Sequence, residues 1–237
     1  KDMAEKYNLL QSALAAAERI QPMLVDPETA EPDDRPAVRL SPAEIEFENV
    51  WFAYEAEEWV LSDVSFTIPA GSFVGVVGLS GSGKTTLISL LLRFYDPQQG
   101  RILIDGQDVR DIPVSLLRHR IAAVFQDVHI FKGSVAENIA LFQPQISAET
   151  IQAAAQTANI ASYIEALPEG YGTKAGYLGS SLSAGQRQLL SFARALATSA
   201  DVLILDEATS SIDSHTEHLV QQAMEKAAAQ RTVLVVA

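Results

Sequence analysis

Apolar and polar residues recur along the chain with two different periods. A period of two predicts half-buried strands over residues 45–50 and 64–68. Further strands, several of them continuous apolar runs, are predicted over residues 73–77, 101–106, 121–125, 202–205 and 232–236. Apolar residues at helical spacing predict helices over residues 2–20, 86–92, 114–120, 134–139, 147–157, 160–166, 183–197 and 213–229. The pattern therefore predicts a domain of the α/β class.

The first 43 residues differ in character from the rest of the chain. Pro22 ends the first predicted helix, which is either a linker to another domain or a helix that simply packs on this one. Residues 26–42 are rich in proline and acidic side chains, which indicates a linker or a solvated strap. The sequence opens on Lys1 rather than methionine and stops at Ala237 within a strand-like run. We therefore expect a piece of a longer protein.

Composition narrows the possible partners. The net charge of −13 disfavours nucleic acid, because no basic face can dominate the surface. The absence of cysteine excludes a disulfide framework. The longest uncharged run, residues 64–83, contains a proline and several glycines and is not a membrane span.

Residues 78–85 (GLSGSGKT) match the phosphate-binding pattern G-x-x-x-x-G-K-[ST] without a mismatch. The predicted strand before them and helix after them supply the context that this loop requires. Glycines let successive backbone N–H groups point at phosphate oxygens, and the helix N-terminus adds partial positive charge. Lys84 is expected to reach the β- and γ-phosphates, and the Thr85 hydroxyl to hold Mg²⁺. The alternative, a Gly/Ser-rich turn that happens to precede a lysine, is disfavoured by the full spacing.

Polar side chains at the ends of two predicted strands fit the same site. Gln126 follows the strand at 121–125, where it could meet a metal or water at the nucleotide or cap the loop backbone. Asp206 and Glu207 follow the strand at 202–205. Asp206 would face the Mg²⁺ shell and Glu207 would polarise the attacking water.

Two further features have both a structural and a functional interpretation. Ser183 and Gln186 fit a capping box, and the glycine-containing helix start that they open could also bind phosphate. Tyr54 lies in a polar loop between two strands, where an aromatic ring could stack on a base or pack on the surface. On its own, the packing interpretation of Tyr54 is favoured.

Together these motifs resemble the nucleotide-binding domain of an ABC transporter, of the exporter type in which the ATPase is fused behind a membrane domain. Residues 78–85 match Walker A, residues 202–206 match Walker B, residues 182–186 match the ABC signature and residues 210–213 match the D-loop. The resemblance implies catalytic roles for Glu207 and Gln126, and metal contacts from Thr85, Gln126 and Asp206. It implies that ATP contacts Tyr54, Gly78, Ser80, Gly81, Ser82, Gly83, Lys84, Thr85, Thr86, Gln126 and Asp206. It implies that Ser183, Ala184, Gly185 and Gln186 face a partner's nucleotide, with Asp213 in the D-loop.

The resemblance also implies an architecture and a function. The expected fold is a P-loop NTPase (RecA-like) core with an antiparallel β subdomain and an α-helical subdomain, about residues 128–197, that carries the signature. Residues 1–25 would be the helix leaving the membrane domain, 26–43 the linker, and 44–237 the ATPase domain, truncated before the switch histidine. The implied activity is ATP hydrolysis with Mg²⁺ at the cytoplasmic face of a membrane. ATP-driven pairing with a second ABC ATPase domain would power translocation through the chain's own or an associated transmembrane domain.

Two departures from the family pattern bear on the partner. Ala184 stands where the signature usually has glycine, and residues 176–179 (GYLG) lack the usual acidic and basic pair. We therefore expect one half of a heterodimer rather than a homodimer. A DNA-repair or chromosome ATPase is disfavoured, because the interval from Lys84 to Ser183 (183 − 84 = 99 residues) has no sustained heptads. A soluble ABC ATPase without a transport role remains the other alternative.

Overall fold

The chain divides into two units, residues 1–35 and 36–237. The computed structural model describes Tyr7, Gln11 and residues 41–55, 58–175, 182–206, 214–228 and 231–236, with the side chains of 214–216 excepted. In the first unit Tyr7 and Gln11 are helical, and the Gln11 side chain donates to the Tyr7 hydroxyl at 3.2 Å. The rest of the helix predicted over 2–20, and the linker predicted before residue 41, lie outside the described residues.

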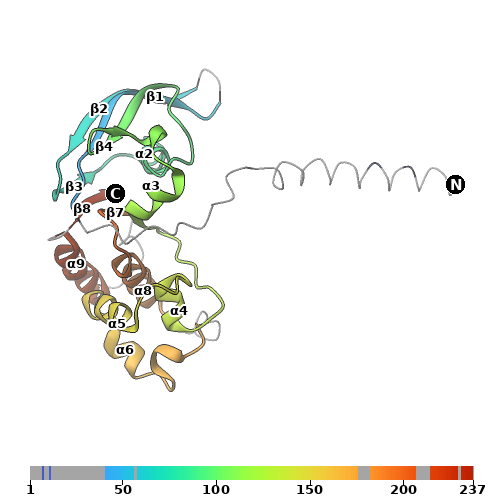
Figure 1. The fold of residues 1–237 in the computed structure, drawn as a ribbon, viewed down its shortest axis with the longest axis vertical. Helices are drawn as coiled ribbons and strands as arrows, with labels where there is room; N and C mark the ends of the chain where they lie inside the picture. Colours follow the sequence, from blue (N-terminus) through green and yellow to red (C-terminus); the bar gives the residue numbers. More distant parts are fainter. Residues whose placement is uncertain are drawn as a thin grey trace. The chain divides into compact units, whose positions relative to one another are not determined.

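An antiparallel sheet forms one end of the second unit (Figure 1). Its strand order is β2-β1-β4-β5, with β1 at Ile45–Ala53, β2 at Trp59–Ile68, β4 at Gln99–Ile104 and β5 at Gln107–Asp108. Strand β1 continues past the end predicted at residue 50. Register shifts between Phe47 and Ala53 interrupt its pairing with β2, and they bring both Val50 and Phe52 into the core. The alternation of buried and less buried side chains is therefore interrupted after residue 48, although the strand continues to Ala53.

A parallel sheet lies in the middle of this unit (Figure 1). Its order is β3-β8-β7-β6, with β3 at Phe73–Val76, β8 at Thr232–Val236, β7 at Val202–Asp206 and β6 at Ile121–Val124. The inner strand β7 is buried on both faces: Val202 and Ile204 join one hydrophobic cluster, whereas Leu203 and Leu205 join another. This two-sided burial explains the uninterrupted apolar run that predicted the strand.

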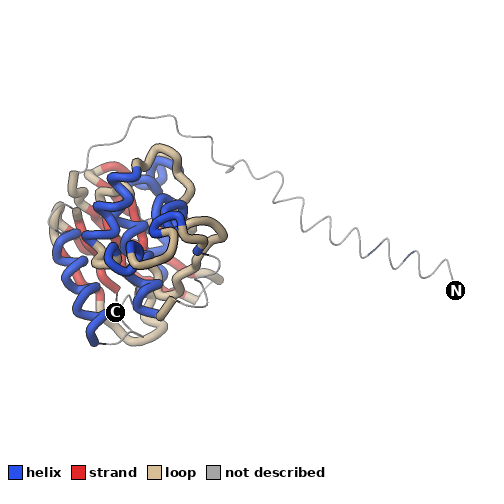
Figure 2. Tube along the Cα trace, turned by 90° about the horizontal axis from the view of Figure 1, so that it is seen from below, coloured by secondary structure: helices blue, strands red, loops and turns tan. Residues whose placement is uncertain are grey.

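Helices pack on both faces of the parallel sheet. In the view from below, several of them lie in front of the strands (Figure 2). The cluster shared with the antiparallel sheet contains residues of α2 (Lys84–Leu91), the short η1 (Val109–Asp111) and α3 (Val114–Arg120). The other cluster contains residues of α4 (Val135–Ala140), α5 (Ala148–Thr157), α6 (Ala161–Glu165), α8 (Ala184–Ala197) and α9 (Ser214–Ala228). The short η2 (Gly170–Gly172) follows α6. The predicted combination of a parallel core, an antiparallel β part and a helical part is confirmed.

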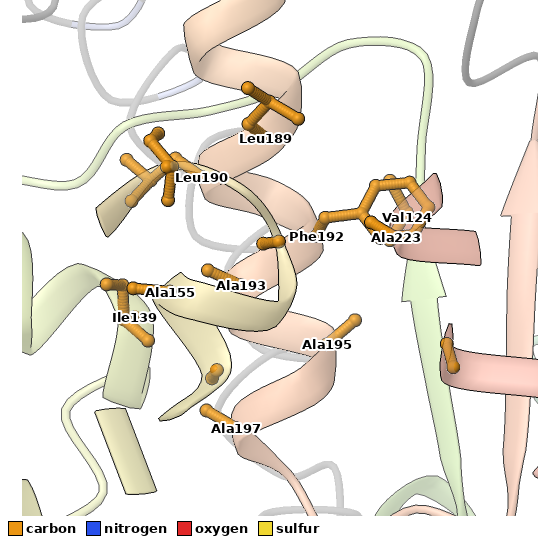
Figure 3. Packing of buried hydrophobic residues seen from close by; sticks show 14 of the residues in the cluster. Val124, Ile139, Ala155, Leu189, Leu190, Phe192, Ala193, Ala195, Ala197 and Ala223 are labelled. Carbon is orange, nitrogen blue, oxygen red and sulfur yellow. The ribbon is translucent and has the colours of Figure 1, made fainter. Parts of the chain in front are cut away.

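Helix α8 is the centre of the second cluster (Figure 3). The Phe192 ring is fully buried and extends from α8 toward Val124 of β6 and Ala223 of α9 (Figure 3). At the C-terminal end of α8, the buried Arg231 donates from Nη1 to the Ala195 carbonyl at 2.9 Å. A guanidinium here satisfies carbonyls that have no partner within the helix. Helix α8 is therefore fixed along its length, and its first turn has a defined position.

Candidate functional site

The predicted phosphate loop connects β3 to α2, and its glycines are required by geometry. Gly81 has φ +82° and Gly83, the N-cap of α2, has φ +87°, a left-handed region that side chains disfavour. A Cβ at Gly78 would approach the Ser82 hydroxyl oxygen to 2.7 Å, and one at Gly83 would approach the Leu61 side chain to 2.8 Å. The Ser82 N–H donates to the Leu79 carbonyl at 3.1 Å and closes the turn. The backbone is thus curled tightly enough to form a cradle for an anion.

Lys84 spans this loop. Its side chain is buried, and Nζ donates to the Gly78 carbonyl at 2.8 Å and to the Leu79 carbonyl at 3.0 Å. Leu79 itself is 85% exposed, so the loop projects from the body of the fold. The ammonium group is held at the loop by acceptors that phosphate oxygens can replace. Among the other predicted contacts, Ser80, Ser82 and Thr85 are exposed and Thr86 is buried.

The sheet register brings the other predicted polar residues to the same edge. Val76, the last residue of β3, and Asp206, the last of β7, both lie opposite Val236 of β8. Asp206 is therefore two strand spacings, about 10 Å, from the strand end that leads into the phosphate loop. Val124 pairs with Leu205, so Gln126, two residues further on, emerges next to the end of β7. These residues therefore lie along the same carboxyl edge of the parallel sheet, where open α/β folds bind ligands.

The donor atoms at this edge suit a hard cation. The Thr85 hydroxyl, the Gln126 amide and the Asp206 carboxylate all offer oxygen, which Mg²⁺ prefers. Within the described ranges there is no group of three or more His, Cys, Asp or Glu side chains that could hold a metal by itself. Oxygen donors beside a phosphate cradle therefore fit a magnesium ion that is shared with phosphate.

Tyr54 lies beside the phosphate loop. Its hydroxyl is 3.2 Å from the Thr86 hydroxyl on α2, so a direct contact connects the aromatic loop with the helix that begins at Lys84. The Tyr54 ring is roughly perpendicular to the rings of Phe52 and Tyr95, with centroid separations of 4.9 and 5.2 Å. The ring is nevertheless half exposed. Tyr95 was not singled out in the sequence, because no motif marks it.

The predicted signature residues open α8 and form a separate group. Ser183 is the N-cap, its hydroxyl accepts from the Gln186 N–H at 3.1 Å, and its own N–H donates to the Gln186 side-chain oxygen at 2.9 Å. The predicted capping box is confirmed. Ser183 and Ala184 are exposed, whereas Gly185 is buried. Both hydrogen bonds of the capping box are local to residues 183–186, at an exposed helix start of the kind that can accept an anion.

A buried arginine connects α8 with the segment after Gln126. Arg194 donates to the Asn138 carbonyl at 2.9 Å, to the Asn138 side-chain oxygen at 2.6 Å and to the His129 carbonyl at 2.5 Å. The Asn138 amide in turn bonds the N–H and the carbonyl of Phe131 at 2.9 and 3.0 Å. Burial lowers the pKa of Arg194 to about 10, because desolvation penalises its charged form. Sequence analysis missed this network, because no local pattern marks Arg194 as buried: Arg187 and Ser191 lie on the same face of α8.

Three predictions fall outside the described residues: Glu207, Asp213 and the loop at 176–179. They remain predictions. Over the described ranges, no helix is both long and apolar enough to cross a membrane.

Comparison with known proteins identifies the family. Residues 61–210 match the model of the family described as ABC transporter. The chain is 43% identical over 235 residues to the "Fatty acid ABC transporter ATP-binding/permease protein" of Mycobacterium bovis, an alignment that covers 99% of this chain and 37% of that protein. It is 46% identical over 230 residues to the "ATP-dependent lipid A-core flippase" of Alkalilimnicola ehrlichii, with coverage of 96% and 39%.

A solved structure is similar over nearly the whole chain. It is titled "Structure of a bacterial Atm1-family ABC exporter with ATP bound" and has 37% sequence identity and a TM-score of 0.81, covering 98% of this chain and 41% of that one. The chain thus spans about two fifths of the length of these relatives. On the family match, the similar fold and the order of the motifs, the chain belongs to the ABC transporter family and corresponds to its ATP-binding domain.

Proposed function

We propose that this chain binds Mg·ATP and hydrolyses it to drive export by a transporter of which it forms the ATPase domain. The observation that carries the proposal is the sheet register, which brings the strand ends leading to Lys84, Asp206 and Gln126 to one carboxyl edge of the parallel sheet. The names of the relatives, an ATP-binding/permease protein and a lipid A-core flippase, support the transport role.

The geometry suggests how the chain holds the nucleotide. Phosphate oxygens would replace the Gly78 and Leu79 carbonyls as acceptors for Lys84 Nζ, which is already buried and aimed across the loop. Backbone N–H groups of residues 80–85 would contact the remaining phosphate oxygens. The half-exposed ring of Tyr54 would stack on the base. Mg²⁺, held by Thr85, Gln126 and Asp206, would neutralise charge on the phosphates.

Hydrolysis requires a group that orients water, and we assign this role to Glu207. In the sequence it follows Asp206 directly. Asp206 ends β7, and the sheet register places that strand end at the same edge as the end of β3, which precedes the phosphate loop. A carboxylate there would accept a hydrogen bond from the attacking water, and Gln126 would help to fix its direction.

The second surface, at the start of α8, would act on a partner's site. The exposed Ser183 hydroxyl and the first N–H groups of α8 form a donor set that suits a γ-phosphate. Because Ser183 and Ala184 are exposed and could contact a nucleotide held by another chain, we propose head-to-tail pairing of two ABC ATPase domains, with Asp213 at the interface. Pairing and release would be transmitted to a transmembrane domain, which would place the chain at the cytoplasmic face of a membrane.

The signature of this chain favours a heterodimer. Ala184 is exposed at the helix start, so its methyl group stands where the partner's nucleotide would approach. Its effect would lie in this contact, since alanine itself favours the helix. A homodimer is the alternative, and Ala184→Gly separates the two. In a homodimer with two equivalent sites, the substitution leaves ATP turnover unchanged; in an asymmetric pair, it raises turnover at the site that this chain completes.

The experiment that tests hydrolysis is Glu207→Gln. In the full-length transporter, this variant should keep its affinity for Mg·ATP and lose turnover by about a hundredfold or more. Glu225→Gln, an exposed change on α9, is the matched control and should behave as the unsubstituted chain. Turnover by Glu207→Gln at the unsubstituted rate would show that another group orients the water.

A further inference from the structure

We propose that Tyr95 is a positioning residue of the nucleotide site: its ring holds Tyr54 in the orientation that stacks on the aromatic base. The inference rests on the proposed function and adds the turn after α2, residues 92–98, to the base-recognition site. It depends on three observations: the anchoring of this turn, its connection to the end of β1, and the geometry of the aromatic rings.

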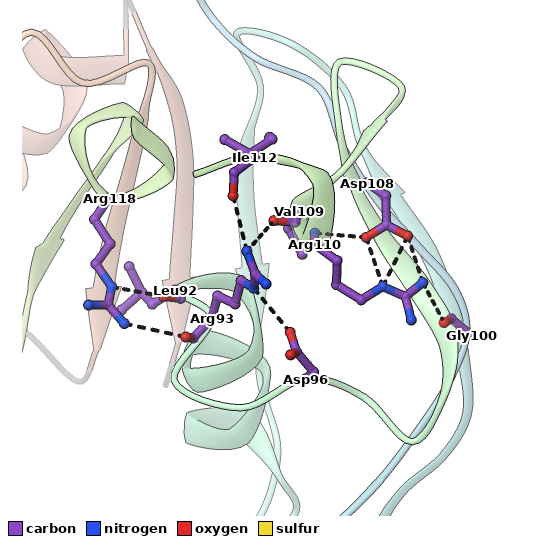
Figure 4. Close-up of polar contacts among 9 residues, drawn as sticks. All are labelled: Leu92, Arg93, Asp96, Gly100, Asp108, Val109, Arg110, Ile112 and Arg118. Atoms are coloured by element: carbon purple, nitrogen blue, oxygen red, sulfur yellow. Dashed lines mark hydrogen bonds and ion pairs between the residues drawn. The ribbon is translucent and has the colours of Figure 1, made fainter. Parts of the chain in front are cut away.

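The turn is fixed by two arginines (Figure 4). Arg93 has a left-handed backbone, with φ +52°. Its Nη1 donates to the Val109 carbonyl at 3.3 Å and to the Ile112 carbonyl at 3.0 Å, at the two ends of η1. Arg118 on α3 donates to the Leu92 carbonyl at 3.2 Å and to the Arg93 carbonyl at 3.3 Å. Hydrogen bonds with two other elements therefore restrain the backbone just before Tyr95.

The same turn is bonded to the end of β1. The Gln98 side chain donates to the Ala53 carbonyl at 2.7 Å and accepts from the Ala53 N–H at 3.1 Å. The Gln98 N–H donates to the Trp51 carbonyl at 3.0 Å. Ala53 immediately precedes Tyr54, so the backbones that carry Tyr54 and Tyr95 are joined as one unit.

The aromatic rings of Phe52, Tyr54 and Tyr95 pack against one another. Tyr95 lies 5.2 Å from Tyr54 at 87° and 5.5 Å from Phe52 at 52°, distances typical of stabilising aromatic pairs. Tyr54 has two further contacts, the Thr86 hydroxyl and the Phe52 ring, and Phe52 is buried. Without Tyr95, the Tyr54 ring keeps its contacts with the Thr86 hydroxyl and the Phe52 ring but loses one of the two aromatic rings packed against it. Tyr95 is half exposed, and its ring contacts among the described residues are those with Tyr54 and Phe52.

The test compares two ligands of the 237-residue chain by calorimetry, Mg·ATP and magnesium tripolyphosphate, which has the phosphates without the base. Tyr95→Ala should weaken ATP by about two- to tenfold, the range for one aromatic pair, and leave tripolyphosphate unchanged. Tyr95→Phe keeps the ring and should bind both as the unsubstituted chain does. Phe142→Ala is the control: Phe142 is an aromatic residue of similar exposure that follows α4 and packs on Phe131 rather than on Tyr54.

A double-mutant cycle makes the test specific. Tyr54→Ala should weaken ATP by itself, and in that background Tyr95→Ala should cost nothing further, because Tyr95 acts through Tyr54. Equal weakening of ATP and tripolyphosphate by Tyr95→Ala would overturn the inference, as would an unchanged ATP affinity or an equal loss in the Tyr54→Ala background. If the unsubstituted chain bound neither ligand, the proposed function itself would fail. If ATP bound and responded to Tyr54→Ala but not to Tyr95→Ala, only the role of Tyr95 would fall.

Discussion

Gly100 and Gly106 offer a matched pair of substitutions that separates backbone strain from steric exclusion. Both have left-handed backbones, with φ +78° and +76°. A Cβ at Gly100 would lie 2.3 Å from the carbonyl oxygens of Glu48 and Asn49 on β1, whereas a Cβ at Gly106 would meet nothing within 4 Å. Alanine at either position carries the same strain, but only Gly100→Ala forces two strands apart.

The expected magnitudes follow from this difference. The left-handed backbone costs a residue with a Cβ roughly 1–2 kcal/mol, and Gly106→Ala should destabilise the fold by that amount. Gly100→Ala adds the cost of overpacking, about 1–3 kcal/mol, because the clash involves backbone atoms that cannot change rotamer. We therefore expect Gly100→Ala to destabilise by about 2–5 kcal/mol.

Urea denaturation measures the difference. The two tryptophans of the chain, Trp51 and Trp59, lie edge to face 5.3 Å apart across β1 and β2, so their fluorescence reports on this sheet. The midpoint should fall for both variants and fall further for Gly100→Ala, with the same slope against urea. Loss of stability in Gly100→Ala that is no larger than in Gly106→Ala would refute the reasoning. It would mean that β1 and β4 adjust without cost.

Two further predictions concern charged side chains. Arg194→Met should destabilise by about 3 kcal/mol, because it removes the donor to the Asn138 and His129 carbonyls and one of the two donors to the Asn138 side-chain oxygen. The exposed Arg101→Met should change urea stability very little. Asp108→Asn should cost about 0.5–1 kcal/mol at pH 7, since the Arg110 side chain and N–H lower the pKa of Asp108. Because that pKa is lower in the folded chain, the contribution is complete above about pH 4 and is lost as the pH falls through the folded pKa. Urea titrations from pH 7 down to acid should therefore show the two chains converging, and a difference that persists or grows in acid would contradict the assignment.

Features encoded within a few neighbouring residues could be predicted from the sequence. The capping box of Ser183 and Gln186 is complete within four residues, and the structure contains both of its hydrogen bonds. The buried strand before Asp206 also follows from local pattern, since burial on both faces requires a continuous apolar run. The predicted positions of the strands and helices around the phosphate loop are correct for the same reason.

Features that depend on distant contacts could not be predicted. The network of Arg194 joins residues 56 positions apart, and no local pattern indicates that Arg194 and Asn138 bond to each other. Tyr95 gains its place only because the antiparallel sheet brings the turn after α2 beside Tyr54. The end of β1 was predicted too early, because register shifts change which residues face the core.

The most direct test of the account is a calorimetric titration of Mg·ATP into this chain and into Lys84→Ala. Lys84 is the buried cation held across the phosphate loop, so its removal should abolish most of the affinity. Lys226→Ala, an exposed change on α9, should bind as the unsubstituted chain does. The account predicts saturable ATP binding that is lost only in Lys84→Ala; equal affinity in Lys84→Ala and the unsubstituted chain would contradict it.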